Sequence, residues 1–247
     1  MEINYKEELN KIQRDHLGRI FGIFAINKPR LITSHDIVYK VRKILQTKKV
    51  GHAGALDPFA EGILLVLVGN YTKRSEMLLK KHKGYRGRII FGIKTNSGDI
   101  DGEIVQTKSE TLEITEDLRK KIEKDFYSQY IQFVPIFSSV KIHGMKLREL
   151  ARSSSSFTIK SIGNSKICEF ALLPNSKFGS KAIDGKLLVE IPSKEVDVKV
   201  DILEMGLLTK TEVIKYFSQD NQHEIQDLNY AYIDIDVFCS KGTYIRQ

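Results

Sequence analysis

The stretch from residue 51 to residue 69 constrains the fold more than any other part of the chain. It reads GHAGALDPFAEGILLVLVG, so a loop of small residues leads to a single acid, Asp57, and an apolar run follows. Gly51 and Gly54 allow backbone conformations closed to other residues, and they let a large partner approach the main chain. The proline after the acid restricts that acid to extended or turn geometry. Ile63 to Val68 has the length and composition of a buried strand, so the sequence predicts an acid held beside a rigid element.

Apolar spacing predicts the elements on either side of this loop. Phe21 to Ile26 is dense in apolar and aromatic residues, as is typical of a strand. A helix should begin at Ser34, which we expect to be its N-cap, and Asp36 favours the first turn. The apolar residues of this helix recur at helical spacing: Ile37, Val38, Val41, Ile44 and Leu45. A second helix is expected from Thr72, as its cap, to Lys81.

The second half of the chain predicts several strands with short helices between them. Strands are expected from Tyr85 onward, over residues 157–160, 167–173 and 187–191, and from residue 232 onward. Helices are expected over residues 115–126, with Thr115 as the cap, and over residues 209–217. The polar stretch 95–103 predicts a hairpin turn rather than a metal site, because the spacing of an EF-hand is absent. Residues 153–156 should form a flexible joint, and residues 175–185 and 218–227 should form insertion loops.

Composition is typical of a globular protein with an excess of positive charge. The 247 residues suit one large domain or two small ones, with ample length for a core. The hydrophobic content of 41% and the charged content of 28% are ordinary for soluble proteins. The net charge of +8 is compatible with a polyanionic partner such as nucleic acid, although many basic proteins bind none.

The sequence gives no signal for a membrane segment, a metal or a disulfide. No apolar run approaches the length that crosses a bilayer, and the N-terminus is too charged for a signal peptide. Cys168 and Cys239 belong to no Cys/His cluster, so we expect no metal site and two reduced, packed thiols. Reduced thiols are typical of the cytoplasm, which is the expected location.

Basic side chains gather in three stretches, around residues 40–49, 83–88 and 141–152. One interpretation is a solvated face of a helix or strand. The other is contact with the phosphates of a nucleic acid, which basic side chains bind in a salt-dependent way. The residues by themselves leave both interpretations open.

Several motifs together resemble those of the TruB family of pseudouridine synthases, which make pseudouridine in the T-loop of tRNA. GHAGALDPFAEGILLVLVG resembles the catalytic motif of that family, although its spacing alone also fits a tight turn with a solvated aspartate. INKPRLITSHDIVYKVRKIL resembles the first family motif, and CSKGTYIR resembles the third. The stretch from Gln132 to Arg152 resembles the thumb, which orders over the RNA stem-loop. The resemblance covers residues 21–152 and 232–247.

The resemblance implies active-site roles for five residues. Asp57 would be the catalytic carboxylate, acting as nucleophile or base at the ribose or the uracil. Tyr85 matches the K-x-Y segment of the family, and together with Tyr244 it would stack on the flipped-out base. Arg246 would pair with Asp57 and hold it ionised. His52 would fill the space that the base leaves.

The resemblance also implies structural and RNA-binding roles. Lys28 and Pro29 would brace the active-site loop. The side chains expected to contact stem phosphates are Lys40, Lys43, Arg86, Lys141, Lys146 and Arg152. The partner would be the T-stem-loop of tRNA, with the uridine at position 55 as the target. The reaction is an isomerisation, so we expect no cofactor and no metal, and we expect a monomer.

The fold implied is α+β: the pseudouridine synthase fold, with a mixed, mostly antiparallel sheet flanked by helices and a thumb insertion at about 132–156. Residues 1–20 would be an N-terminal extension. Residues 21–247 would be the catalytic domain, with its C-terminal end and any PUA domain missing. Two alternatives remain: a guide-RNA-dependent synthase acting on rRNA, and a non-catalytic protein that binds or folds tRNA. The presence of Asp57, Tyr85 and Arg246 argues against the second alternative.

Overall fold

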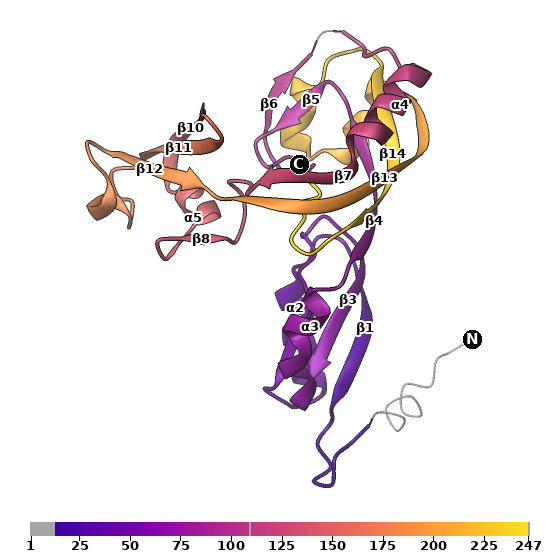
Figure 1. The fold of residues 1–247 in the computed structure, drawn as a ribbon, viewed down its shortest axis with the longest axis vertical. Coiled ribbons are helices and arrows are strands. Elements are labelled where there is room, and N and C mark those ends of the chain that lie inside the picture. Colours follow the sequence, from indigo (N-terminus) through magenta and orange to yellow (C-terminus); the bar gives the residue numbers. More distant parts are fainter. Residues whose placement is uncertain (1–12, 109, 247) are drawn as a thin grey trace. The chain divides into compact units, whose positions relative to one another are not determined.

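A computed structural model describes residues 13–108 and 110–246 (Figure 1). The chain forms two compact units, Met1–Lys81 and His82–Gln247, and each is described here by itself. The predicted N-terminal extension falls partly outside the described residues, which begin at residue 13. Within its described part, Arg14 and Ile20 form an isolated antiparallel bridge.

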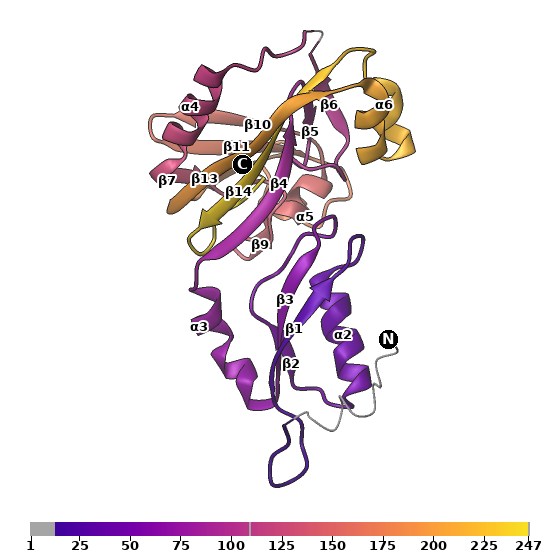
Figure 2. The same cartoon turned by 90° about the vertical axis from the view of Figure 1, so that its right-hand side faces the viewer.

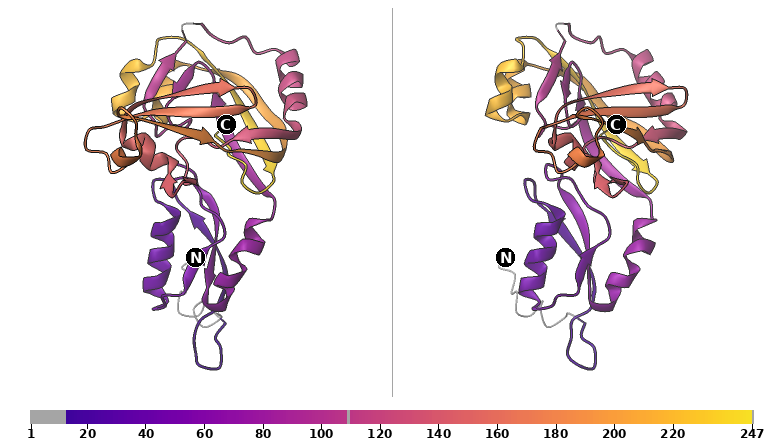
Figure 3. Two further views of the ribbon diagram at one scale, coloured as in Figure 1. Left: turned by 60° about the vertical axis from the view of Figure 1, so that its left-hand side comes forward. Right: turned by 90° about the vertical axis from the view of Figure 1, so that its left-hand side faces the viewer.

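A three-stranded antiparallel sheet forms the centre of the first unit. Its order is β1-β3-β2, with β1 at Gly22–Lys28, β2 at Val50–His52 and β3 at Gly62–Val68. Helix α2, Ser34–Ile44, lies on one side of this sheet, and α3, Ser75–Leu79, lies on the other (Figures 2 and 3). The buried core between α2 and the sheet consists of Ile37, Val38, Val50, Leu64, Val66 and Val68. The strands predicted at 21–26 and 63–68 are thus confirmed.

Two predicted helix caps in the first unit are wrong. The N-cap of α2 is Thr33 rather than Ser34, because Thr33 and Asp36 form a capping box with each other. Thr72 caps no α-helix, because it lies inside a short 3-10 helix, η1 at Gly69–Arg74. The α-helix α3 that follows begins at Ser75 without a side-chain cap. The predicted helix from 72 to 81 is therefore split in two.

A four-stranded antiparallel sheet forms the main body of the second unit. Its order is β4-β14-β13-β7, with β4 at Lys83–Ile90, β14 at Tyr230–Cys239, β13 at Ser193–Leu208 and β7 at Tyr127–Phe133. Helix α4, Glu116–Asp125, contacts β13 and has Thr115 as its N-cap, as predicted. One face of the sheet carries alternating apolar residues that pack as a core: Val196, Val198, Val200, Ile202, Ile233, Ile235, Val237 and Cys239.

A second sheet in this unit has the order β10-β11-β12. Its strands are Ser154–Ile162, Ser165–Leu172 and Lys186–Ile191. Its core includes Cys168, Phe170 and Val189, together with Leu147 and Leu150 of helix α5, Leu147–Arg152. The predicted flexible joint at 153–156 is wrong, because residues 154–156 belong to β10 and pair with β11 through a bulge.

Shorter elements complete the second unit. The hairpins are β5–β6, at Ile93–Thr95 and Ile104–Thr107, and β8–β9, at Lys141–Ile142 and Met145–Lys146. The first confirms the turn predicted at 95–103. Helix α6, Lys210–Val213, continues into the 3-10 helix η3, Ile214–Tyr216, and Thr209 caps it. Residues 179–181 form the 3-10 helix η2 in the loop predicted at 175–185.

The loop predicted at 218–227 is mostly exposed or half-buried, and one residue of it is buried. It contains the 3-10 helix η4, Gln219–Glu224, and Ile225 is only 1% exposed. Across the described residues, every pairing between named strands is antiparallel and helices lie against the sheets. The α+β class with mostly antiparallel sheets is confirmed.

Candidate active site

The loop that carries Asp57 connects β2 to β3 in the first unit, and Asp57 is exposed. Gly54 adopts a φ of +120°, which side-chain-bearing residues rarely adopt, so the chain turns there at a glycine. The Ala53 N–H donates to the Leu65 carbonyl at 2.9 Å, and the Ala60 N–H donates to the Asp57 carbonyl at 3.1 Å. The loop is therefore tied to β3 on its near side and closed by a turn at the acid.

Lys28, the last residue of β1, is fully buried and holds the loop through hydrogen bonds to main-chain carbonyls. Its ammonium donates to the carbonyls of Pro29 and Ile32, each at 2.9 Å, and to that of Pro58 at 3.2 Å. These three bonds use all three donors of the group. Burial lowers the pKa of Lys28, and the charges of Asp57 and Glu61 act in the opposite direction. This geometry suits the brace predicted for Lys28, and Pro29 takes part through its carbonyl, which accepts from Lys28.

A second contact holds the loop at the residue before the acid. The Leu56 N–H donates to Ser34 Oγ at 2.9 Å, and the Ser34 hydroxyl lies 3.2 Å from the Leu56 carbonyl, to which it donates. On the other side of the acid, the Leu31 N–H donates to the Pro58 carbonyl at 2.8 Å. The main chain is thus fixed immediately before and immediately after Asp57.

His52 ends β2 and lies half-buried near the same loop. Its ring meets the ring of His35 edge-on, with centroids 6.3 Å apart. Burial lowers the pKa of His52, and the charge of His35 acts in the same direction. Its Nδ1 is buried and has no hydrogen-bond partner among the described residues. A neutral imidazole with a spare ring nitrogen suits contact with an uncharged polar group.

Tyr85 lies on β4 of the second unit, in register with Val237 of β14. Its ring is partly buried against the core of the four-stranded sheet. The opposite face of β4 carries Arg86, whose guanidinium donates to both oxygens of Asp236 at 2.8 Å. Tyr85 therefore has one side of its ring supported by packing, as a stacking platform requires.

Tyr244 follows β14 and is held through its main chain. The Tyr244 N–H donates to Gln132 Oε1 at 2.8 Å, and Gln132 Nε2 donates to the Tyr244 carbonyl at 2.9 Å. Gln132 is only 3% exposed, so the amide is inside the protein. Burial raises the pKa of the Tyr244 phenol. The two bonds fix the backbone from which the Tyr244 ring projects.

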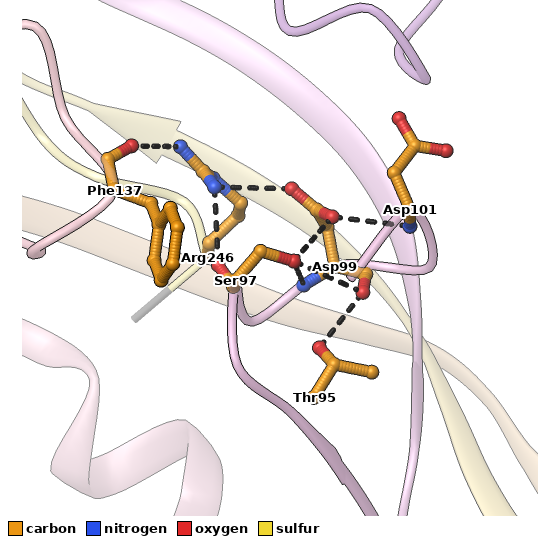
Figure 4. A network of polar contacts seen from close by, with 6 residues as sticks. All are labelled: Thr95, Ser97, Asp99, Asp101, Phe137 and Arg246. Atoms are coloured by element: carbon orange, nitrogen blue, oxygen red, sulfur yellow. Dashed lines mark hydrogen bonds and ion pairs between the residues drawn. The ribbon is translucent and has the colours of Figure 1, made fainter. Parts of the chain in front are cut away.

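Arg246 is the centre of a polar network, which Figure 4 shows. Its Nη1 donates to Asp99 Oδ2 and to the Ser97 carbonyl, each at 3.0 Å, and its Nη2 donates to the Phe137 carbonyl at 3.3 Å. The Arg246 and Asp99 side chains are 17% and 7% exposed. The predicted pairing of Arg246 with Asp57 stays a prediction, since Asp57 belongs to the other unit.

The second carboxylate oxygen of Asp99 stabilises the turn itself. Asp99 Oδ1 accepts from the Ser97 hydroxyl at 2.7 Å and from the Asp101 N–H at 3.1 Å. A Cβ added at Gly98, where φ is +75°, would lie 3.3 Å from the Arg246 carbonyl oxygen. The close approach of the two segments thus favours glycine at this position.

The six predicted RNA-binding side chains fall into two groups. Lys40 and Lys43 on α2, Lys141 on β8 and Arg152 at the end of α5 are exposed. Arg86 and Lys146 are paired, the first with Asp236 and the second with Glu149 at 3.0 Å. The four exposed side chains are accessible to an anion from solvent, whereas Arg86 and Lys146 each already have a carboxylate partner.

In the first unit, the predicted residues therefore include one braced carboxylate loop. In the second unit, Tyr85 and Tyr244 pack against two different cores, and Arg246 is held by Asp99. Sequence reasoning missed three contacts with these residues or their loop, which are made by Ser34, Gln132 and Asp99. The spacing Thr33-x-x-Asp36 indicates a capping box, and therefore that Ser34 is not the cap.

Among the described residues, no group of three or more His, Cys, Asp and Glu side chains could hold a metal ion. No helix in the described part of the chain is long and apolar enough to cross a membrane.

Comparison with known proteins shows which family the chain resembles. The model of the family described as TruB family pseudouridylate synthase (N terminal domain) matches residues 42–182, more than half of the chain. The tRNA pseudouridine synthase B of Alkaliphilus oremlandii is 36% identical over 225 residues, which cover 91% of this chain and 56% of that protein. The corresponding protein of Pediococcus pentosaceus is 45% identical over 132 residues, covering 53% of this chain and 44% of that protein.

Among solved structures, a chain in the crystal structure of a Cbf5-Nop10-Gar1 complex is 19% identical to this one. Its TM-score is 0.48, with 95% of this chain and 48% of that chain covered. The chain spans about half the length of the curated relatives named above.

Proposed function

Because this chain belongs to the TruB family of pseudouridylate synthases, we propose that it converts a uridine of tRNA to pseudouridine. Asp57 carries the proposal. It lies inside the matched residues 42–182, on a loop whose main chain is held on both sides by buried groups. A carboxylate presented in this way is suited to act on a reacting group rather than to end a turn. The target we propose is uridine 55 in the T-loop.

The chemistry needs few participants. The bond from N1 of uracil to C1′ of the ribose breaks, the base turns, and a bond from C5 to C1′ forms. C5 loses a proton and N1 gains one, so the product is an isomer and no electrons enter or leave. Asp57 would supply the carboxylate, either as nucleophile or as the base that takes a proton.

The supported side chains of the second unit would hold the base. The target uridine must leave its stack, which costs a few kcal/mol. Stacking on Tyr85 and Tyr244 would return about 1–3 kcal/mol per base. His52, whose pKa burial lowers, is suited to contact the RNA as a neutral ring. Arg246, held by Asp99, would supply positive charge for Asp57 or for a phosphate.

Exposed basic side chains would bind the stem of the T-loop. Lys40, Lys43, Lys141 and Arg152 are exposed and would contact phosphates directly. Arg86 and Lys146 would do so while they share their charge with Asp236 and Glu149. Binding should therefore weaken steeply as salt rises. A tRNA substrate also favours a cytoplasmic protein, and we expect it to act as a monomer.

The test follows from the proton that C5 loses. Unmodified tRNA transcripts labelled with tritium at C5 of uridine are incubated with the chain, with Asp57→Asn and with the control Asp227→Asn. Asp227 is an exposed aspartate in the second unit, so its substitution makes the same change of charge elsewhere. We expect tritium release from the unaltered chain and from the control, and none from Asp57→Asn.

The outcomes separate the proposal from its alternatives. Mapping of the product to uridine 55 supports the T-loop target, whereas product at another uridine contradicts it. Tight, salt-sensitive tRNA binding without release of tritium indicates a non-catalytic RNA-binding protein. Equal release from the unaltered chain and from Asp57→Asn overturns the role given to Asp57.

A further inference from the structure

Ser34 has a hydroxyl that takes no part in capping its own helix. The cap of α2 is Thr33, whose hydroxyl accepts from the Asp36 N–H at 3.1 Å. Asp36 in turn accepts from the Thr33 N–H at 2.9 Å and from the Thr33 hydroxyl at 2.6 Å. This reciprocal pair stabilises the first turn and leaves the Ser34 hydroxyl available for another partner.

That partner is the main chain of a single residue, Leu56, which lies 22 positions further along the chain. Ser34 Oγ accepts from the Leu56 N–H at 2.9 Å and donates to the Leu56 carbonyl at 3.2 Å. Ser34 is 4% exposed, so water competes little for either bond. One side chain thus binds both polar groups of the residue that immediately precedes Asp57.

This contact complements the one beyond the acid. The Pro58 carbonyl accepts from Lys28 at 3.2 Å and from the Leu31 N–H at 2.8 Å. Leu56 and Pro58 are therefore both fixed, and the residue between them has little freedom to rotate. Without the contact at Leu56, the loop would be held from one side only, and the direction of the Asp57 carboxylate would vary.

We propose that Ser34 is a positioning residue for Asp57, and that its hydroxyl holds the N–H and the carbonyl of Leu56 so that the carboxylate faces the reacting nucleotide in one orientation. The proposal rests on the proposed function. A misplacement of about 1 Å in an active site costs about 100-fold in rate. Loss of the Ser34 hydroxyl should therefore lower turnover by about 10- to 100-fold, while the binding of tRNA through distant basic residues persists.

The test compares two neighbouring hydroxyls. Ser34→Ala removes the contact with Leu56, and Thr33→Ala removes the helix cap but keeps Ser34. Thr33→Ala loses an N-cap and Ser34→Ala loses two buried hydrogen bonds, so both variants should lower the melting temperature. We expect kcat to fall by about 10- to 100-fold only in Ser34→Ala, with KM for tRNA unchanged. A purely structural role predicts instead that kcat follows the melting temperature in both variants.

Amide hydrogen exchange gives a measurement that needs no substrate. The Leu56 amide should exchange at least about 10-fold faster in Ser34→Ala, while amides in the middle of α2, such as that of Val41, keep their rates. In Thr33→Ala, the Leu56 amide should stay protected. Unchanged exchange at Leu56 in Ser34→Ala overturns the contact, and a wild-type kcat in that variant overturns the positioning role. If the unaltered chain makes no pseudouridine, the proposed function itself fails, and the positioning role of Ser34 fails with it.

Discussion

The contact between Gln132 and Tyr244 allows a quantitative prediction. Gln132→Met keeps the length and flexibility of the side chain but removes its amide. Two hydrogen bonds to the Tyr244 main chain, at 2.8 and 2.9 Å, are lost. A neutral hydrogen bond contributes about 0.5–1.5 kcal/mol net, so the free energy of unfolding should fall by about 1–3 kcal/mol. Methionine fills the site, which is only 3% exposed, with apolar atoms of similar volume, so no cavity adds to the loss of the two hydrogen bonds. We therefore expect a value near the middle of that range, at about 2 kcal/mol.

Activity should suffer more than stability alone explains. Tyr244 would lose the two bonds that set its backbone, so its ring would no longer be held where a base can stack. Gln222→Met is the matched control. Gln222 lies in the same unit and likewise makes two hydrogen bonds to the main chain, donating to the carbonyls of Ile214 at 3.1 Å and Phe217 at 3.2 Å. We expect the control to lose a similar free energy of unfolding and to keep its turnover.

The assay combines urea unfolding, followed by circular dichroism, with tritium release from labelled tRNA under conditions where each variant is fully folded. The chain contains no tryptophan, so unfolding is followed by circular dichroism rather than by tryptophan fluorescence. A loss below about 0.5 kcal/mol in Gln132→Met would show that the two bonds contribute little. Equal turnover in Gln132→Met and Gln222→Met would refute the idea that Gln132 acts through Tyr244.

Two further predictions concern Asp99 and Leu31. Asp99→Asn removes the charge that faces Arg246 at 3.0 Å, so the free energy of unfolding should fall by about 1.5–3 kcal/mol and turnover should also fall. The control Asp101→Asn, in the same turn, should stay close to wild type in both. Urea unfolding and tritium release measure the two quantities, and unchanged turnover in Asp99→Asn contradicts the role of the pair. Leu31 has a φ of +67° and a side chain that is 78% exposed, so Leu31→Gly should relieve strain and stabilise the protein by about 0.5–1 kcal/mol. A lower melting temperature in Leu31→Gly would show that the leucine side chain contributes packing that outweighs its backbone strain.

Elements with a strong local signal were predictable from the sequence. The apolar run at 63–68 is a strand, and Thr115 caps a helix, because hydrophobic periodicity and capping are encoded within a few residues. The same rule could have found more. In β13, buried Val196, Val198 and Val200 alternate with exposed charged residues, which is the pattern of a half-buried strand. This 16-residue strand was nevertheless not predicted.

The cap of α2 shows how two local signals compete. Thr33 and Ser34 are both good N-cap residues, and residue type alone does not separate them. Spacing does, because Asp36 stands three residues after Thr33 and can complete a capping box, whereas Ile37 stands three residues after Ser34. The choice also bears on the proposed role of Ser34, since only a serine that is not the cap has a hydroxyl free to hold Leu56.

The contacts that orient the candidate site lie beyond any local rule. Gln132 and Tyr244 are 112 residues apart, and Asp99 and Arg246 are 147 apart. The Gln132 amide offers one acceptor and one donor, as a peptide group does, so it pairs with the Tyr244 main chain much as a neighbouring strand would. A sequence names such donors and acceptors, but many glutamines and carboxylates satisfy the same description. Which of them meet depends on the order β4-β14-β13-β7, because β13 lies between β7 and β14 and sets where the segment after β14 passes the end of β7. Gln132 therefore becomes visible as a partner of Tyr244 only when the sheet order is known, even though a motif already names Tyr244.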